Sequence, residues 1–447
     1  MKIAWFTPFR KVSAIGRFSR LVTDQLAQYA QVDLWLAEAE NEELHRTSLR
    51  IVRYLELSCP ESFLREYDVI AYNLGDHMLN HRTIFEMSRR VPGVIILHDY
   101  VMHHFFAGYY SQRAEWDAYV EVMRRWYSAD LRKMPNGGWA GDSWQVWERE
   151  EVIHYPLFEE AVVGSIAVVT HADFVRDSVA RVAGAPVTKI PLAYEARSPG
   201  LILSREELQI PDDRVLVVSI GHLNENKRIQ VVLQVLAANP DLARSVMYVG
   251  IGSCDGPFAP KLQELRRKLG LGDAVRFTEY APDEVLSSYL FHADFCVNMR
   301  WPAMEGGSAS IAEEMLCGKA VIVTDTGVYS ELPETCVRKV RPEHETEDLT
   351  LHLRELATEG DLRRRMGEQA RRYAEALYNP AFYAERFLEF CSEVPYYQPA
   401  LRLMDTAGRE LRRIGVTSEM PIVDAVARES ELLMDGDYDP PILRRRE

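Results

Sequence analysis

The residues best placed to do chemistry lie between Glu305 and Glu313, where two carboxylates flank a run of glycine and serine. The pattern after this run predicts a serine-capped helix that ends at Gly318. A helix N-terminus offers free N–H groups and a positive dipole, which suit a pyrophosphate, and glycine lets the backbone approach a ligand closely. The residues expected to line this end of the site are Gly306, Gly307, Ser308 and Ala309.

Positive charge is expected from the loop that follows the predicted strand Val215–Ile220. Lys227 and Arg228 lie in this loop, with His222 near its start. Cations here could neutralise a diphosphate. A guanidinium would be a stronger partner than an imidazole, so His222 makes this end of the site the least secure.

Histidine and aspartate follow another predicted strand, Gly93–Leu97, as His98 and Asp99. Because loops at the carboxyl ends of parallel strands gather at one edge of a sheet, His98 is expected to face a ligand cleft. Three more histidines lie near it in the sequence, at positions 77, 103 and 104. Their spacing is not that of a metal-ligand set, so no metal site is predicted.

Each of these motifs has a purely structural alternative. The Glu305–Glu313 segment also fits a capped amphipathic helix with surface glutamates, and the Lys227 loop also fits an ordinary surface turn. His98 could be a satisfied core histidine. From the residues alone these alternatives stay open.

The first half of the chain predicts a parallel sheet covered by helices. Short apolar runs alternate with helical stretches, which is typical of strands buried on both faces. The predicted strands are Lys2–Phe6, Val32–Leu36, Asp68–Tyr72, Gly93–Leu97, Ala167–Thr170 and Val187–Ile190. A helix from about Gly16 follows the first loop and is expected to face the cleft.

Residues 100–158 interrupt this alternation. The stretch is long, mostly helical in pattern and rich in aromatic residues, with one clear loop at Asn136-Gly137-Gly138. Such an excursion often determines substrate specificity. An acceptor is expected here, near Asp99, Tyr100 and His103, although a helical subdomain filled by its own aromatics fits equally well.

The second half repeats the strand–helix alternation after a linker at about 193–204. The predicted strands are Val215–Ile220, Val246–Val249, Ala274–Thr278, Asp294–Asn298 and Ala320–Val323. We therefore predict an α/β protein with two Rossmann-like domains facing across a cleft, residues 1–196 and 205–377. Residues 378–447 are expected to form helices that pack back on the first domain, followed by a tail.

The composition narrows the classes of partner. The 447 residues carry a net charge of −15, which argues against binding nucleic acid. Six cysteines without metal-ligand spacing are expected to be reduced thiols. The sequence shows neither a signal peptide nor an apolar run long enough to span a membrane, so a cytoplasmic protein is expected.

The segment from Asn298 to Pro333 closely resembles the E-x7-E signature of family 4 retaining glycosyltransferases. The resemblance includes both glutamates, the serine-rich helix start, the turn at Gly318-Lys319 and the strand after it. It implies the two-domain GT-B fold with a C-terminal helix that crosses back to the N-terminal domain. Weaker similarities lie at Lys227, at His98 and in the loop before Gly16. The resemblance as a whole covers about residues 1–390.

This resemblance implies a role for each matched residue. Glu305 would contact the hydroxyls of the donor sugar, and Glu313 those of the ribose. Lys227 would hold the diphosphate, with His222 standing where the family usually has arginine. His98 would lie near the donor sugar, and Gly16 across from the phosphates.

The function expected from the resemblance is transfer of a hexosyl unit, with retention, from a nucleoside diphosphate sugar to an acceptor hydroxyl. The acceptor would be a glycan, a glycolipid or a small metabolite, and neither a metal nor another cofactor is expected. Two alternatives remain: another enzyme on this architecture, such as a nucleotide-sugar epimerase or a phosphorylase, and a catalytically silent relative that only binds. The oligomeric state is not predicted.

Overall fold

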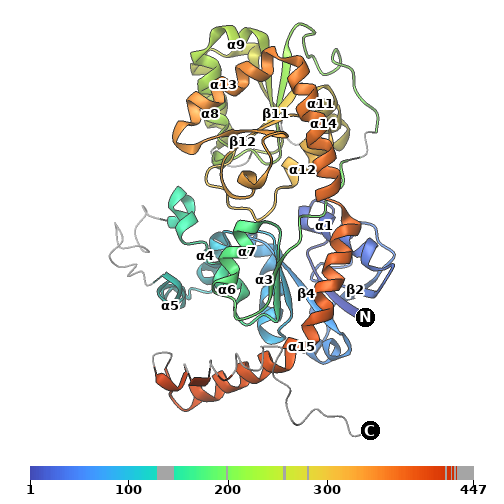
Figure 1. The fold of residues 1–447 in the computed structure, drawn as a ribbon, viewed down its shortest axis with the longest axis vertical. Helices are drawn as coiled ribbons and strands as arrows, with labels where there is room; N and C mark the ends of the chain where they lie inside the picture. Colours follow the sequence, from blue (N-terminus) through green and yellow to red (C-terminus); the bar gives the residue numbers. More distant parts are fainter. Residues whose placement is uncertain are drawn as a thin grey trace.

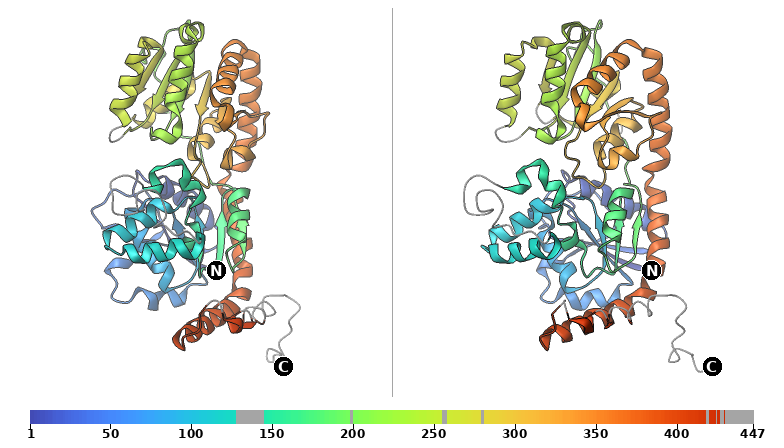
Figure 2. Two further views of the ribbon diagram at one scale, coloured as in Figure 1. Left: turned by 90° about the vertical axis from the view of Figure 1, so that its left-hand side faces the viewer. Right: turned by 60° about the vertical axis from the view of Figure 1, so that its left-hand side comes forward.

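The chain folds around two parallel β-sheets, one in each half of the sequence (Figure 1). The computed structural model describes residues 1–127, 145–197, 200–254, 258–278 and 281–417, and a few positions between 420 and 429. The two sheets and their helices stack end to end, and a long helix runs along one side of the N-terminal half (Figures 1 and 2). The α/β class and the two Rossmann-like units are as predicted.

The N-terminal sheet has seven parallel strands in the order β3-β2-β1-β4-β5-β6-β7. The central strands are buried apolar runs, which is what a sheet covered on both faces requires. The strands are β1 Lys2–Phe6, β2 Gln31–Leu36, β3 Arg50–Arg53, β4 Val69–Leu74, β5 Val94–Leu97, β6 Ala167–Thr170 and β7 Val187–Lys189. The helices are α1 Ala14–Leu26, α2 Pro60–Phe63, α3 Met78–Arg90, α4 His103–Gln112, α5 Trp116–Tyr127, α6 Phe158–Val162 and α7 Asp173–Ala180.

The C-terminal sheet has six parallel strands in the order β10-β9-β8-β11-β12-β13. The strands are β8 Val215–Ile220, β9 Val246–Ile251, β10 Val275–Thr278, β11 Phe295–Asn298, β12 Val321–Thr324 and β13 Val337–Val340. The helices are α8 Ile229–Ala238, α9 Pro240–Ser245, α10 Phe258–Lys268, α11 Asp283–His292, α12 Ala309–Leu316, α13 Glu345–Thr358 and α14 Gly360–Leu377, and the chain continues into α15 Pro380–Arg413.

Two strands were not predicted from the sequence, β3 and β13. Both are edge strands of four residues, and two of the four are charged: β3 reads Arg-Ile-Val-Arg and β13 reads Val-Arg-Lys-Val. An edge strand faces solvent on one side, so it lacks the continuous apolar run that identifies a central parallel strand.

The excursion after β5 is helical over its described part, as predicted. Phe105 and Phe106 of α4 are fully buried, and both rings meet Phe85 of α3 edge-on. Tyr119 of α5 is also buried and packs on Tyr110. Many of the aromatics therefore fill the core that the excursion shares with the N-terminal sheet and α3. The predicted loop at 136–138 lies outside the described residues.

Helix α15 crosses back from the C-terminal half to the N-terminal one (Figure 1). The break before it lies at Asn379, whose side chain accepts hydrogen bonds from the backbone N–H of Ala381 and Phe382. On α15, Tyr383 packs edge-on against Phe18 of α1. Phe387 meets Trp5 of β1 in the same way. This confirms the predicted return of the C-terminal helix.

No helix within the described ranges is both long enough and apolar enough to cross a lipid bilayer.

The packing of α15 can be tested with two phenylalanines on that helix. Phe387 is fully buried against the N-terminal sheet, whereas Phe382 is 42% exposed. Phe387→Ala should lower the free energy of unfolding by about 3–5 kcal/mol, because it leaves a cavity beside Trp5. Phe382→Ala is the matched control and should cost less than about 1 kcal/mol. Equal losses in urea denaturation would show that α15 is not docked on the N-terminal domain.

Candidate functional site

In the C-terminal sheet, candidate site residues follow the two strands that flank the point where strand order reverses. In the C-terminal sheet this point lies between β8 and β11, and Lys227 and Glu305 lie in the loops after these two strands. In the N-terminal sheet it lies between β1 and β4. Ligands of open parallel sheets bind at such points, outside the carboxyl ends of the strands. The folded chain therefore brings the predicted loops to the boundary between its two halves.

Glu305 is held by two groups that the sequence did not single out. Its Oε1 accepts from Nε of Arg300 at 2.9 Å and from the hydroxyl of Tyr329. Its Oε2 accepts from the backbone N–H of Met304 at 3.1 Å. Three of the roughly four acceptor positions of a carboxylate are therefore used within the chain. The side chain is 17% exposed, so the remaining position can accept from a ligand hydroxyl.

The charge of Glu305 is stabilised although the carboxylate is poorly hydrated. Burial raises its pKa, but the Arg300 guanidinium and the Tyr329 hydroxyl together lower it further, so the net pKa lies below the ordinary value. Glu305 is therefore an anion at neutral pH and acts as a hydrogen-bond acceptor only.

The Glu305 loop docks by its backbone on the loop after β5 of the N-terminal half. The carbonyl of Met304 accepts from the N–H groups of Tyr100 and Val101, both at 2.9 Å. The N–H of Gly306 donates to the carbonyl of His98 at 2.9 Å, and Asp99 pairs with Glu305 as an isolated antiparallel bridge. The loop from Met304 to Gly306 is called the docking loop below.

Gly306 and Gly307 allow the two halves of the chain to approach each other closely. A Cβ on Gly306 would lie 2.9 Å from the carbonyl oxygen of His98, and one on Gly307 would lie 3.2 Å from Cβ of His171. The sequence predicted close approach to a ligand. The structure instead places these glycines against the N-terminal half.

The helix that follows begins as predicted. Ser308 is the N-cap of α12 and its hydroxyl accepts from the N–H of Ile311 at 3.4 Å, with Ala309 as the first helical residue. After α12, Gly318 adopts a φ of +69°, the left-handed conformation of a glycine that follows a helix.

Glu313 lies on α12 but is already occupied by this chain's own groups. Its buried carboxylate accepts from the Tyr194 hydroxyl at 2.5 Å, and from the backbone N–H and Nη1 of Arg197 at 2.9 and 3.0 Å. Arg17 of α1 lies 3.8 Å away. Tyr194 and Arg197 belong to the segment that joins the two sheets, so Glu313 connects α12, this segment and α1.

Lys227 is buried beneath the turn at Gly221 and donates from Nζ to the carbonyl of Ile220. Burial holds the pKa of Lys227 well below its ordinary value, and Arg300 adds to the shift. Glu314 shares this buried region and accepts from Nδ2 of Asn298 at 2.8 Å. Burial raises the pKa of Glu314 to about 7. An ammonium group has three donors, so Lys227 can bind an anion in addition to Ile220.

His222 and Arg228, the other two candidate residues of the Lys227 loop, differ in whether their side chains can contact a ligand. Nδ1 of His222 lies 3.0 Å from the hydroxyl of Ser253, in an exposed position. The guanidinium of Arg228 donates to both carboxylate oxygens of Glu345, at 2.8 and 2.6 Å, and lies 3.5 Å from Glu150. Arg228 is therefore committed to carboxylates and does not replace the missing arginine at position 222.

The His98 ring does not face an open cleft. It is buried, with Nε2 2.9 Å from Oδ1 of Asn73 and Nδ1 3.2 Å from Nε2 of His171. Burial holds the pKa of His98 well below the ordinary value, and His171 lowers it further. Only its carbonyl reaches the docking loop. The prediction that His98 presents its imidazole to the cleft does not agree with this arrangement.

The three residues expected near an acceptor have different surroundings. Asp99 is partly exposed, and burial together with Asp76 raises its pKa to about 7. Tyr100 packs its ring on Phe158. His103 is fully buried, with its ring nitrogens on the carbonyl of Tyr155 and the hydroxyl of Tyr119, so it is a core histidine and cannot contact an acceptor as it stands.

Gly16 lies in the first turn of α1, and its N–H donates to the Ser13 cap at 3.0 Å. A Cβ at this position would lie 2.9 Å from the carbonyl oxygen of Pro8. Gly16 is thus needed for α1 to pack on the preceding loop. The start of α1 lies beside α12, because Arg17 reaches Glu313.

Sequence reasoning missed Arg300, Tyr329, His171 and Arg197. His171 could have been found, since it directly follows the predicted strand Ala167–Thr170 just as His98 follows Gly93–Leu97. Arg300 follows β11 and precedes Glu305 by five residues, which was also visible. Tyr329 and Arg197 come from distant segments, and only the fold places them on the two glutamates.

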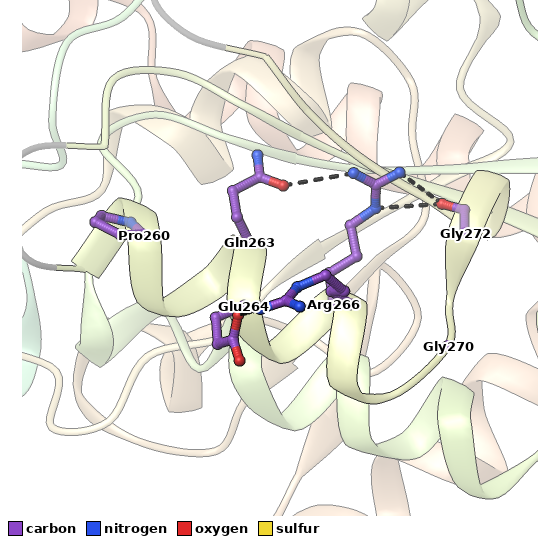
Figure 3. Close-up of a pocket in the computed structure, with 7 residues that line it drawn as sticks. Pro260, Gln263, Glu264, Arg266, Gly270 and Gly272 are labelled. Atoms are coloured by element: carbon purple, nitrogen blue, oxygen red, sulfur yellow. Dashed lines mark hydrogen bonds and ion pairs between the residues drawn. The ribbon is translucent and has the colours of Figure 1, made fainter.

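Two cavities differ in their relation to this site. One of about 200 Å³ lies between the two halves and includes His171, Lys189, Gly307 and Ser308 in its lining. A larger one of about 700 Å³ lies on the surface of α10 (Figure 3). There Arg266 donates to the carbonyl of Gly272 from Nε and Nη2, and no candidate site residue lines it.

Among the described residues, no group of three or more histidine, cysteine, aspartate or glutamate side chains is arranged to hold a metal ion.

The raised pKa of Glu314 predicts a specific pH dependence of stability. Because its pKa is about 7 in the folded chain and its ordinary value is 4.5, the stability that this carboxyl contributes is present below pH 4.5 and is lost as the pH rises through 7. Relative to wild type, Glu314→Gln should therefore be more stable, and this difference in the free energy of unfolding should be about 1–3 kcal/mol larger at pH 8 than at pH 5. The difference in Tm between variant and wild type, measured from pH 5 to 8, reports this change.

Glu347→Gln, on the exposed side of α13, is the control and should leave the difference in Tm constant over this range. A Glu314→Gln difference that does not grow with pH would contradict the buried, largely protonated carboxyl.

Comparisons with known proteins agree with this geometry. Residues 202–373 match the family model described as glycosyl transferases group 1. Sucrose-phosphate synthase from Thermosynechococcus elongatus superposes with a TM-score of 0.61 at 15% identity, covering 88% of this chain and 99% of that one. Anabaena Alr3699/HepE in complex with UDP-glucose gives 0.57 at 16%, covering 88% and 100%.

WaaG, a glycosyltransferase involved in lipopolysaccharide biosynthesis, gives a TM-score of 0.57 at 16% identity, covering 86% of this chain and 99% of that one. No curated protein sequence matches the chain. At these identities the solved structures show the fold, and the family match shows the kind of domain. The chain therefore has the GT-B fold, and its residues 202–373 are similar to the group 1 glycosyl transferases.

Proposed function

We propose that this protein transfers a hexosyl unit from a nucleoside diphosphate sugar to an acceptor hydroxyl and retains the configuration at the anomeric carbon. The observation that carries the proposal is the placement of Glu305 and Lys227 after the two strands that flank the switch point of the C-terminal sheet. An anionic acceptor for sugar hydroxyls and a cation for phosphate thus lie on neighbouring loops of a glycosyltransferase domain.

Glu305 would bind the donor sugar. Arg300 and Tyr329 keep it ionised and fix its orientation, and it retains one acceptor position for a hydroxyl. A phosphate group could not use this position, because two anions would repel each other. The docking loop carries Glu305 between the two halves of the chain, where a sugar would be shielded from water.

Lys227 and the N-terminus of α12 would bind the diphosphate. Lys227 is buried and has ammonium donors to spare, and a bound anion would favour its charged form. His222 lies in the same loop at an exposed position. Glu313 would bind the ribose once Arg197 moves aside, since Arg197 now supplies two of the three hydrogen bonds that it accepts.

The reaction needs no carboxylate nucleophile. As the bond from the anomeric carbon to the diphosphate breaks, charge develops on the leaving oxygen, and Lys227 and the helix N-terminus would stabilise it. The same oxygen can then take the proton from the acceptor hydroxyl, which attacks from the face that the diphosphate leaves. Attack on that face retains the configuration. No metal or other cofactor enters this scheme.

A uridine diphosphate sugar is the first donor to try, because one structure with the same fold was solved with UDP-glucose. The acceptor would approach from the side of Asp99, a partly exposed residue beside the docking loop. We propose a saccharide, a lipid-linked sugar or a small metabolite as its class.

The diphosphate end can be tested by thermal shift with UDP-, GDP- and ADP-sugars. A donor at 100 times its dissociation constant should stabilise the protein by about 2.7 kcal/mol. Lys227→Met should weaken the binding of that donor at least about tenfold, because it removes the buried cation. Lys261→Met, on the exposed side of α10, is the control and should bind like wild type. If none of these donors shifts the melting temperature, the proposed function is wrong.

Glu305→Gln tests the sugar end. The amide keeps the shape of the side chain but loses the negative charge and half of the acceptor capacity. Turnover of the donor should fall by about 100-fold or more, while the dissociation constant for UDP alone stays within about threefold, since UDP lacks the sugar. Turnover is measured as release of UDP. Normal turnover by this variant would remove Glu305 from the reaction.

A further inference from the structure

A row of hydrogen-bonded groups crosses the carboxyl edge of the N-terminal sheet. The side-chain amide of Asn73 (β4) donates to the carbonyl of Phe6 (β1) at 2.8 Å, and its Oδ1 lies 2.9 Å from Nε2 of His98, after β5. Nδ1 of His98 lies 3.2 Å from Nε2 of His171, after β6. Nδ1 of His171 lies 2.9 Å from the carbonyl of Ile190, after β7. We call these five groups the imidazole row.

The imidazole row follows the spatial order of the sheet, β1-β4-β5-β6-β7, with one group from each strand or the loop after it. Hydrogen bonds of this kind tie the loops to one another at the edge where a ligand of the sheet would bind. His171 holds the row together, because its two ring nitrogens join His98 to the last strand.

The protons of the two rings can be counted. The rings make three contacts, one with Asn73 Oδ1, one with each other and one with Ile190 O, and each contact needs one hydrogen. Two neutral imidazoles supply two. Burial holds the pKa of His98 well below the ordinary value and lowers that of His171 to about 4. Near neutral pH the pair is therefore uncharged, at most two of its three contacts are hydrogen bonds at one time, and its role is one of position.

The surroundings of the pair agree with an uncharged state. His81 of α3 and Tyr383 of α15 are the titratable side chains packed nearest to the rings, with His81 bonded to the carbonyl of Asn73. On the cavity side of His171 lie Asp173 and Lys189, paired with each other, and Glu331, which accepts from the N–H of Phe174. Within the described chain, no carboxylate bonds to either ring.

The imidazole row bears directly on the docking loop. The carbonyl of His98 accepts from the N–H of Gly306, and the following loop residues bind the carbonyl of Met304. His171 also touches this segment, since a Cβ on Gly307 would lie 3.2 Å from Cβ of His171. A change in the tilt of the His98 ring moves the main-chain carbonyl of His98. Because this carbonyl accepts from Gly306, the loop that carries Glu305 moves with it.

We propose that His171 is a positioning residue of the transfer reaction: it fixes the His98 ring, and thereby the main-chain carbonyl on which the docking loop sits. The inference rests on the proposed function in that Glu305 must bind the donor sugar. It assigns His171 no proton transfer and no contact with the donor.

The test compares three variants. His171→Phe keeps the ring volume but has no nitrogen, so it opens the imidazole row. His171→Gln keeps one donor and one acceptor and can still join His98 to Ile190. Tyr54→Phe also removes a buried hydrogen-bonding group of the same domain, a hydroxyl that bonds to Thr83 away from the row. It is the control for general destabilisation.

Turnover of UDP-glucose is the first readout. His171→Phe should lower kcat by between about 10-fold and 100-fold, since Glu305 is displaced by a fraction of an ångström to an ångström, and leave the dissociation constant for UDP within about twofold. His171→Gln and Tyr54→Phe should keep kcat within about threefold of wild type. The ratio of wild-type to His171→Phe turnover should be constant from pH 6 to 8. A ratio that changes with pH would mean an acid–base role and overturn the proposal.

Hydrogen exchange is the second readout and does not depend on turnover. The amide of Gly306 should exchange faster in His171→Phe than in wild type, His171→Gln or Tyr54→Phe, because its acceptor is no longer fixed. If the wild-type protein neither binds nor turns over any donor, the proposed function is refuted. Hydrogen exchange at Gly306 then decides by itself whether His171 positions the docking loop. Unchanged exchange at Gly306, or normal kcat in His171→Phe, would refute the positioning role.

Discussion

The backbone contact between the docking loop and the loop after β5 is the constraint on which the rest of the site depends. Three hydrogen bonds and one bridge join Met304, Glu305 and Gly306 to His98–Val101. Backbone contacts of this kind have little tolerance, because the chain must approach within hydrogen-bond distance along its whole length. Gly306 is required for this reason, since any Cβ there would collide with the His98 carbonyl. The position of Glu305 is thus set by both halves of the protein.

Charge is arranged around this contact so that each ionised group has a partner. Arg300 faces Glu305 and Arg197 faces Glu313, whereas burial favours the neutral forms of Lys227 and of its neighbour Glu314. Buried charges are costly unless paired, so each of these two carboxylates is held by a guanidinium in the absence of a ligand. They also define what a ligand must offer. An anion can compete for Lys227 and hydroxyl groups can donate to the glutamates, as the proposed nucleoside diphosphate sugar would.

The sequence predicted the two sheets, the α12 helix and the returning C-terminal helix, because each leaves a local pattern of apolar runs, caps and breaks. It also predicted the loops of Lys227 and Glu305. It did not predict what these residues contact. Arg228 was expected at the phosphates but binds Glu345, and the His98 ring was expected in a cleft but lies in the imidazole row. Side-chain partners come from segments far apart in the chain, and no local pattern encodes them.

The stereochemistry of the first product tests the central claim most directly. Wild-type protein is incubated with UDP-glucose, whose sugar is the α-anomer, and the anomeric proton of the released or transferred glucose is followed by NMR before mutarotation. The account predicts that the α-anomer appears first and that Glu305→Gln abolishes it. Initial formation of the β-anomer, or α-product that persists in the Glu305→Gln variant, would contradict a retaining transfer built on the docking loop.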